Sequence, residues 1–178
     1  MNLNQLLSFF MKDKKVLVPK EIQINEICLR LVFSPYHIDS KGKLKKEALL
    51  PPLGRNDISL FRQSYITKEK IDELGSQMSN EKKTFKAVAS IKRLWVLENN
   101  NWAGNEHLSI SADIYYSPMN KGKYIDENID VYVNDKNVDM PFHADMRYNC
   151  KLDSTVQTQL RKYASHLIKS MGIVSMAH

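Results

Sequence analysis

The stretch MPFHADMRYN, residues 140–149, alternates apolar and polar side chains. In chain order these are Phe142, His143, Ala144, Asp145, Met146, Arg147 and Tyr148. Successive side chains of a β-strand point to opposite faces, so the pattern predicts a strand with one apolar face. The other face presents an imidazole, a carboxylate and a guanidinium in a row. This segment is therefore a candidate site as well as a structural element.

The same period-two alternation recurs along the chain. It predicts strands within residues 15–18, 27–33, 57–62, 85–91, 107–116 and 129–133. The apolar run at 94–97 is expected to continue the fourth of these strands, up to a turn at 99–101. An exposed loop or hairpin turn is expected around Lys41-Gly42. Several connections are too short for a crossover helix, so the sheet should be mainly antiparallel and twisted.

Three segments have helical features. Residues 1–14 read as a short amphipathic helix, and Thr67 is a plausible N-cap for a middle helix. Ser154 and Gln157 have the spacing of a capping box, at the start of a long C-terminal helix. The apolar stripe of that helix is Val156, Leu160, Ala164, Leu167, Ile168 and Met171, with Gly172 as its stop.

These elements predict an α+β fold with a single domain over residues 1–178. The N-terminal helix would occupy residues 1–14, the sheet core 15–150 and the C-terminal helix 151–178. One further helix is expected in the middle of the chain. Residues from about 95 to 128 look like an insertion in the sheet core.

The chain has 178 residues and a formal net charge of +6. A basic balance favours anionic partners such as nucleic acid, nucleotides or an acidic protein surface. The densest clusters are Lys12, Lys14 and Lys15, and then Lys41, Lys43, Lys45 and Lys46. For both clusters we favour the interpretation that they are solvated lysines at loops and strand ends. Trp95 and Trp102 are not interleaved with basic residues in the sequence, so nucleic-acid binding rests on charge alone.

Cysteine usage and the N-terminal sequence indicate a cytoplasmic protein. Cys28 and Cys150 lie in no metal-binding spacing, and both are expected to be thiols. The N-terminal apolar run is too short to span a bilayer and lacks a preceding basic region, so no membrane insertion is expected.

Motifs for nucleotide cofactors, metalloproteases or serine hydrolases are missing from the sequence. No cofactor or metal is expected. His143 and Asp145 could act as general base and orienting carboxylate, or as two metal ligands. Side chains at i and i+2 of a strand stand ~7 Å apart. The two side chains can therefore interact only if they lean towards each other or if a third group bridges them. The alternative, which we favour, is that His143 and Arg147 bond neighbouring strands while Asp145 faces solvent.

A second hypothesis concerns the arginines. If the strands carrying them are neighbours, Arg30, Ser59, Arg62 and His143 could converge around an anion-binding cleft. The planar guanidinium suits phosphate and carboxylate. The alternative is a structural salt bridge, for instance with Asp57 or Asp145.

Several short motifs follow one another in a particular order along the chain. They are Ile27-Cys28-Leu29-Arg30, then Ala48-Leu49-Leu50-Pro51-Pro52, Asp57-Ile58-Ser59-Leu60-Phe61-Arg62, Phe85-Lys86-Ala87-Val88-Ala89-Ser90-Ile91, and Pro141-Phe142-His143-Ala144-Asp145-Met146. In this order the chain resembles a widespread group of small uncharacterised bacterial proteins. The likeness covers residues 27–148, less the stretch from about 95 to 128. It implies a bacterial, cytoplasmic protein, brings no activity with it, and puts Arg30, Ser59, Arg62, His143 and Asp145 on matching motif positions.

Three functions remain open at this point. The first is a non-enzymatic accessory or interaction component of a bacterial multi-protein system, of a defence or toxin–immunity kind, with another bacterial protein subunit as its partner. The second is an enzyme, or enzyme remnant, acting on a phosphate-bearing nucleotide or nucleic acid. In it Arg30 and Arg62 would hold the anion while His143 and Asp145 handle protons. The third is a basic nucleic-acid-binding module.

Overall fold

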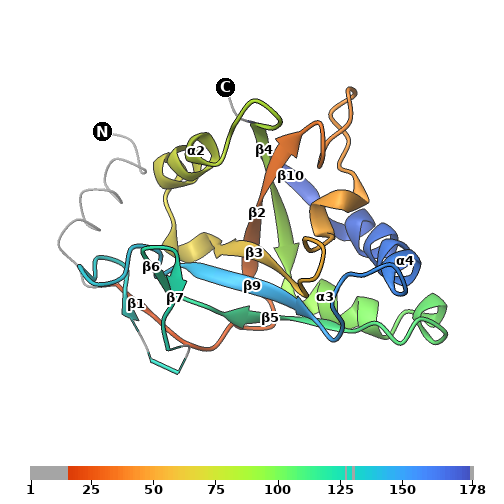
Figure 1. Cartoon of the computed structure of the whole chain (residues 1–178). Coiled ribbons are helices and arrows are strands. Elements are labelled where there is room, and N and C mark those ends of the chain that lie inside the picture. The colour runs from red at the N-terminus through yellow and green to blue at the C-terminus, as the bar shows by residue number, and fades with distance from the viewer. Residues whose placement is uncertain (1–15, 127, 130, 177–178) are drawn as a thin grey trace.

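A six-stranded antiparallel sheet organises the computed structural model, which describes residues 16–126, 128, 129 and 131–176 (Figure 1). In spatial order its strands are β10 (Gly172–Met176), β4 (Thr84–Lys92), β2 (Ile27–Ser34), β3 (Asp57–Arg62), β9 (His143–Tyr148) and β5 (Ala112–Tyr116). Two small two-stranded sheets pair β1 (Leu17–Val18) with β8 (Val131–Tyr132), and β6 (Met119–Asn120) with β7 (Lys123–Tyr124).

Helices lie on both faces of the main sheet. The α-helices are α2 (Lys68–Gln77), α3 (Arg93–Asn100) and α4 (Gln157–Leu167), and the 3-10 turns are η1 (Lys46–Leu49), η2 (Gln63–Tyr65), η3 (Ala103–Asn105) and η4 (Ile168–Ser170). In Figure 1, α4 and α3 lie to the right of the strands, while α2 lies apart from them at the upper left. None of the described helices is long and apolar enough to cross a membrane.

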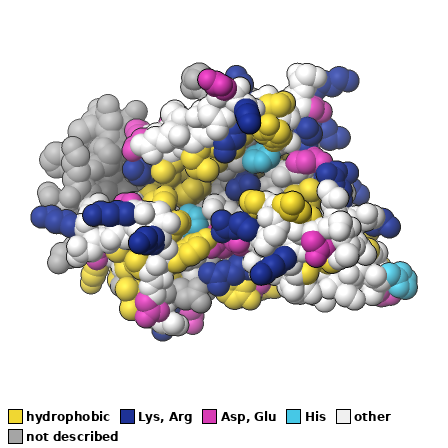
Figure 2. Space-filling model, in the orientation of Figure 1, with side chains coloured by type: hydrophobic (Ala, Val, Ile, Leu, Met, Phe, Trp, Pro, Cys, Tyr) yellow, Lys and Arg dark blue, Asp and Glu magenta, His cyan; other side chains and the backbone are white. Residues whose placement is uncertain are grey.

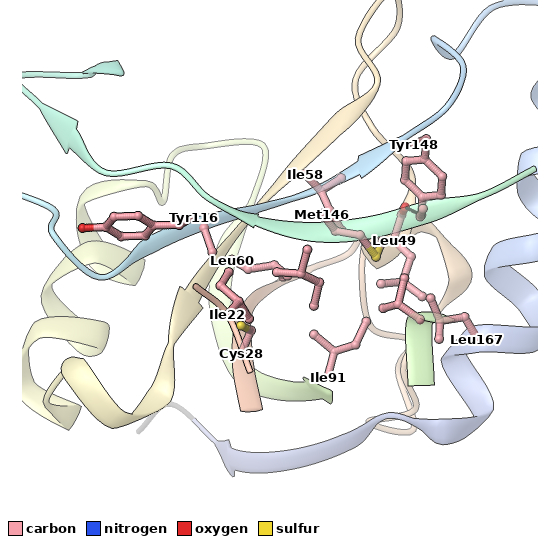
Figure 3. Close-up of a cluster of buried hydrophobic side chains, with 14 of the residues drawn as sticks. Ile22, Cys28, Leu49, Ile58, Leu60, Ile91, Tyr116, Met146, Tyr148 and Leu167 are labelled. Atoms are coloured by element: carbon pink, nitrogen blue, oxygen red, sulfur yellow. Dashed lines mark hydrogen bonds between the residues drawn. The ribbon is translucent and has the colours of Figure 1, made fainter. Parts of the chain in front are cut away.

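The sheet has a hydrophobic core on each face. On one face, Leu160 and Leu167 of α4 pack with Cys28, Leu60 and Met146, and Figure 3 shows part of this cluster. On the other face, Ile71 and Leu74 of α2 pack with side chains of β2, β3 and β4. At ~25 cal/mol per Å² of apolar area removed from water, these two clusters are the main stabilisation of the sheet.

The α+β class and the antiparallel sheet are confirmed. Strand 57–62 has the predicted bounds, and the alternation at 27–33, 85–91 and 142–148 corresponds to β2, β4 and β9. Thr67 caps α2 by accepting a hydrogen bond from the amide of Lys70. The expected hairpin forms, with Ile38 bridged to Leu44 and Gly42 at a φ of 78°. Such a positive φ costs glycine little because it has no Cβ.

The middle of the chain differs from the prediction. The run at 94–97 is not a continuation of β4 but lies in α3, so the structure has two middle helices. Within 107–116 only Ala112–Tyr116 forms a strand. That strand is one edge of the main sheet, so residues 95–128 contribute to the sheet.

The C-terminal region also differs. Helix α4 ends at Leu167, and after η4 the chain forms β10, which pairs with β4. The predicted capping box is wrong: Asp153 Oδ1, not Ser154, accepts from the amides of Thr155 and Val156. The predicted N-terminal helix at 1–14 lies outside the described residues.

Candidate functional sites

Arg62 is fully buried, and its guanidinium forms hydrogen bonds with other groups of the protein. Its Nε lies 2.5 Å from Glu26 Oε1, and Nη2 donates to Glu26 Oε2 at 2.9 Å and to the carbonyl of Glu21 at 3.0 Å. Nη1 donates to the carbonyl of Pro19. The guanidinium also lies over the rings of Tyr65 and Tyr116. Arg62 therefore ties the segment before β2 to the sheet, and four of its five N–H donors bond groups of the protein.

Arg30 is bonded to backbone carbonyls. Its Nε donates to Ala48 and its Nη1 to Ser59, each at 2.9 Å. Burial lowers the pKa of Arg30 to about 10. These bonds join η1 and β3 to the face of β2 on which Arg30 lies. Arg30 therefore has a structural role.

The predicted convergence of the arginines with His143 does not occur. Residues directly opposite each other in an antiparallel pair share a face. Arg62 is opposite Cys28, whereas His143 is opposite Phe61, the neighbour of Arg62 on β3. Arg62 and His143 therefore point to opposite faces of the sheet.

Ser59 and Asp145 are paired on the face that carries His143. Arg30 shares the face of Cys28, two residues away on β2, and so lies on the other side. No single cleft can include all five predicted residues.

His143 and Asp145 form a buried pair. His143 is 2% exposed and Asp145 is 1% exposed, with His143 Nε2 at 3.9 Å from Asp145 Oδ1. His143 Nδ1 lies 2.8 Å from the carbonyl oxygen of Ser117. The Ser117 hydroxyl oxygen also lies 3.0 Å from Nδ1, so the backbone carbonyl can accept from this nitrogen and the hydroxyl can donate to it, according to the imidazole tautomer.

The surroundings of the pair oppose charge on either group. Burial lowers the pKa of His143, and the nearby carboxylate of Asp145 acts against that effect. Burial likewise raises the pKa of Asp145, and His143 acts against it. At 3.9 Å, Nε2 and Oδ1 are too far apart to share a hydrogen bond, so the two groups act on each other through charge alone.

The expectation that Asp145 faces solvent is wrong, whereas His143 does bond a neighbouring segment, at Ser117. Arg147 Nη2 is 3.9 Å from Asp145 Oδ2, and its guanidinium lies over the ring of Tyr115. The described residues contain no cluster of three or more potential metal ligands. A catalytic role for His143 and Asp145 stays a prediction.

A basic groove lies between the 38–44 hairpin with η1 on one side and α4 on the other. It consists of two adjoining hollows of about 460 and 710 Å³, which share Lys46, Ser165 and Lys169. Its charged side chains are Lys43, Lys45, Lys46, Glu47, Arg161, Lys162 and Lys169. In Figure 2, Lys and Arg side chains lie over the hairpin at the upper right, and others are spread over the rest of this face.

The hairpin side of the groove is held by its own hydrogen bonds. Asp39 Oδ1 accepts from the amides of Lys41 and Lys43, each at 2.9 Å. The amide of Lys45 donates to the carbonyl of His37, and Lys45 Nζ donates to the carbonyl of Pro35. The lysine side chains on this side of the groove therefore project from an ordered turn.

The helix side of the groove follows from the amphipathic pattern of α4. Leu160, Ala164 and Leu167 are buried in the core. Residues between them on the helix surface, among them Arg161 and Lys162, consequently point outwards into the groove.

One end of the groove contains two stacked rings. The Trp102 indole and the His166 imidazole have centroids 4.0 Å apart and planes 9° apart. His166 Nδ1 lies 2.6 Å from Asn99 Oδ1, and the Asn99 amide nitrogen donates to the carbonyl of Tyr163. Asn99 thus fixes the ring orientation. Burial lowers the pKa of His166, and so does the charge of Lys169.

The groove was not predicted from the sequence. A basic stripe at helical spacing, Arg161, Lys162 and His166 of α4 with Lys169 of η4, is present in the sequence and could have been recognised. The lysines near Lys43 and the indole of Trp102 come from distant segments, so their position beside that stripe is a property of the fold alone.

Comparison of the chain with models of protein families, with curated proteins and with solved structures finds no match.

Proposed function

We propose that this protein is a non-catalytic binding component that holds a polyanionic partner, a nucleic acid, in the basic groove. The observation that carries the proposal is the set of lysines without carboxylate partners. Within the described residues, Lys43, Lys46, Lys162 and Lys169 line the groove with no carboxylate oxygen within 4.0 Å. A partner that supplies anions would neutralise them.

The distribution of charge supports a polyanion over a single small anion. The groove has six cationic side chains and one carboxylate, so most of the chain's net charge of +6 is concentrated there. The carboxylate, Glu47, is already paired with Arg161 at 3.2 Å. Two adjoining hollows with cations on both walls suit a linear chain of phosphates better than one phosphate.

Catalysis at the groove has little support. Its acid–base candidate, His166, directs Nδ1 to Asn99 and stacks on Trp102. His143 and Asp145 are almost completely buried and belong to another part of the sheet. The proposal therefore joins the expected interaction component with the expected basic nucleic-acid-binding module.

The test is fluorescence anisotropy with a labelled 12-nucleotide strand, titrated with the full chain at several salt concentrations. The logarithm of the binding constant should fall linearly with the logarithm of the salt concentration, with a slope of roughly −0.7 for each phosphate that the protein neutralises. The double variant Lys46→Glu/Lys169→Glu should bind at least about ten-fold more weakly, because each charge reversal adds repulsion.

The matched control is Lys123→Glu/Lys136→Glu, which makes the same change in net charge. Both control residues are exposed, and Lys123 lies in β7, at the other end of the molecule from α4 (Figure 1). The control should keep at least half of the wild-type affinity. Equal losses in both variants, or no binding at low salt, would refute the proposal.

A further inference from the structure

The Trp102–His166 stack is a rigid aromatic surface inside a cationic hollow. A Cβ at Gly104 would lie 2.2–2.6 Å from atoms of the Trp102 ring, so the backbone of η3 is packed against the indole. The His166 ring packs against the indole as well, and Asn99 holds that ring in place. Neither ring needs to reorganise before it meets a ligand.

The same hollow contains both the rings and four cations. Trp102 and His166 line it together with Lys46, Arg161, Lys162 and Lys169. Trp102 and His166 are both only partly buried, and because η3 and His166 already pack against the indole, the imidazole is the ring of the pair on which a base can stack. An aromatic surface beside cations matches the chemistry of a nucleotide, which has a planar base and a phosphate.

We propose that the groove binds single-stranded nucleic acid, with an unpaired base stacked at the Trp102–His166 end and the phosphates on the lysines. This inference rests on the proposed function and specifies its ligand. A duplex keeps its base faces stacked inside, and an acidic protein surface offers carboxylates without nucleobases. Of these three polyanions, a single strand alone presents both groups that the hollow accommodates.

The experiment compares four probes of equal length: a 12-nucleotide DNA strand, the RNA equivalent, an abasic strand with the same phosphates, and the DNA duplex. Wild-type protein should bind both base-containing strands more tightly than the abasic strand and the duplex. Trp102→Leu should weaken binding of the base-containing strands roughly 5- to 150-fold, the range expected for one lost stack. Its affinity for the abasic strand should change less than about two-fold.

Three further variants separate stacking from charge and from misfolding. Gly104→Ala should act in the same direction as Trp102→Leu, because the new methyl group displaces the indole without altering charge. Trp95→Leu, at a tryptophan outside the groove lining, should leave the preference for base-containing strands unchanged. Lys46→Glu/Lys169→Glu should weaken all four probes. Far-ultraviolet circular dichroism verifies that each variant is folded.

Quenching of Trp102 fluorescence by the bound base supplies a measurement that requires no substitution in the groove, and Trp95→Leu isolates that signal. Equal binding of the base-containing and abasic strands by wild-type protein, or equal losses for both in Trp102→Leu, would overturn the stacking proposal while leaving polyanion binding intact. Tighter binding of the duplex would overturn the preference for a single strand. Failure of every probe to bind at low salt would instead refute the proposed function.

Discussion

Buried arginines of the sheet are bonded within the protein, whereas four lysines of the basic groove, Lys43, Lys46, Lys162 and Lys169, have no carboxylate partner among the described residues. Arg62, in the interior, has a carboxylate, two backbone carbonyls and two aromatic rings as partners. Lys46 and Lys162, in the groove, have no carboxylate partner among the described residues. Cations of the first kind hold the fold together, and cations of the second kind remain available for an external anion. Stability and binding measurements should therefore respond to these two groups in opposite ways.

Replacing Arg62 should have the largest effect. Arg62→Met leaves Glu26 as a largely buried carboxylate without its partner, with a side chain 9% exposed. Breaking a buried ion pair in this way typically costs ~3–5 kcal/mol of unfolding free energy. Urea denaturation followed by circular dichroism measures the loss.

The control for that substitution is Arg55→Met, at an ion pair with Asp57 whose arginine side chain is 54% exposed. Exposed pairs contribute about 0–1 kcal/mol. The distinction between interior and surface charges fails if Arg62→Met destabilises the protein no more than this control.

Acidification should have the next largest effect, through the partly buried His37 and the buried His143, which stay neutral in the folded protein. Burial, and then the charge of Arg30, lower the pKa of His37 from 6.5 to about 3. Below pH 6.5 the unfolded chain binds a proton that the folded chain does not, so stability is lost as the pH falls. At pH 5 the cost for such a group reaches about 2 kcal/mol. His143 contributes with the same sign.

The measurement is the unfolding free energy at pH 7.5 and at pH 5.0, for wild type and for His37→Asn. The Asn oxygen can accept the hydrogen bond that His37 Nδ1 receives from the amide of Phe33. The variant should lose less stability on acidification than wild type, by up to about 2 kcal/mol. An unchanged pH dependence would mean that His37 becomes protonated in the folded state at pH 5.

The parts of the fold that follow from local pattern were predictable. β3 and β9 have alternating apolar residues, and the Thr67 cap needs only its own first turn. The α3 helix was missed because its buried positions, Val96 and Asn99, include a polar residue that favours a turn in the sequence. Asn99 is buried because it bonds Tyr163 and His166, and a local pattern contains no sign of those partners.

The C-terminal strand and the candidate sites depended on distant contacts. β10 forms because Gly172 and Ile173 pair with Ser90 and Ala89 of β4. The faces of Arg62 and His143 depend on strand register, and the single-residue offset between Arg62 and Phe61 places them on opposite sides. Period-two patterns specify two faces for each strand but do not state which faces of different strands coincide.

Removing one unpaired groove lysine should have the smallest effect and the opposite sign. Lys162→Gln keeps helix propensity and removes a cation from the hollow that also contains Lys46, Arg161 and Lys169. Relief of like-charge repulsion is worth about 0.2–0.5 kcal/mol per close pair, so stability should rise slightly at low salt. The matched change Lys70→Gln removes an i,i+3 pair with Glu73 and should lower stability by a similar amount. Both shifts in the urea midpoint should vanish in 1 M salt, where charges are screened within ~3 Å. A loss of stability in Lys162→Gln would mean that the groove lysines have structural partners, and the contrast between the two regions would no longer hold.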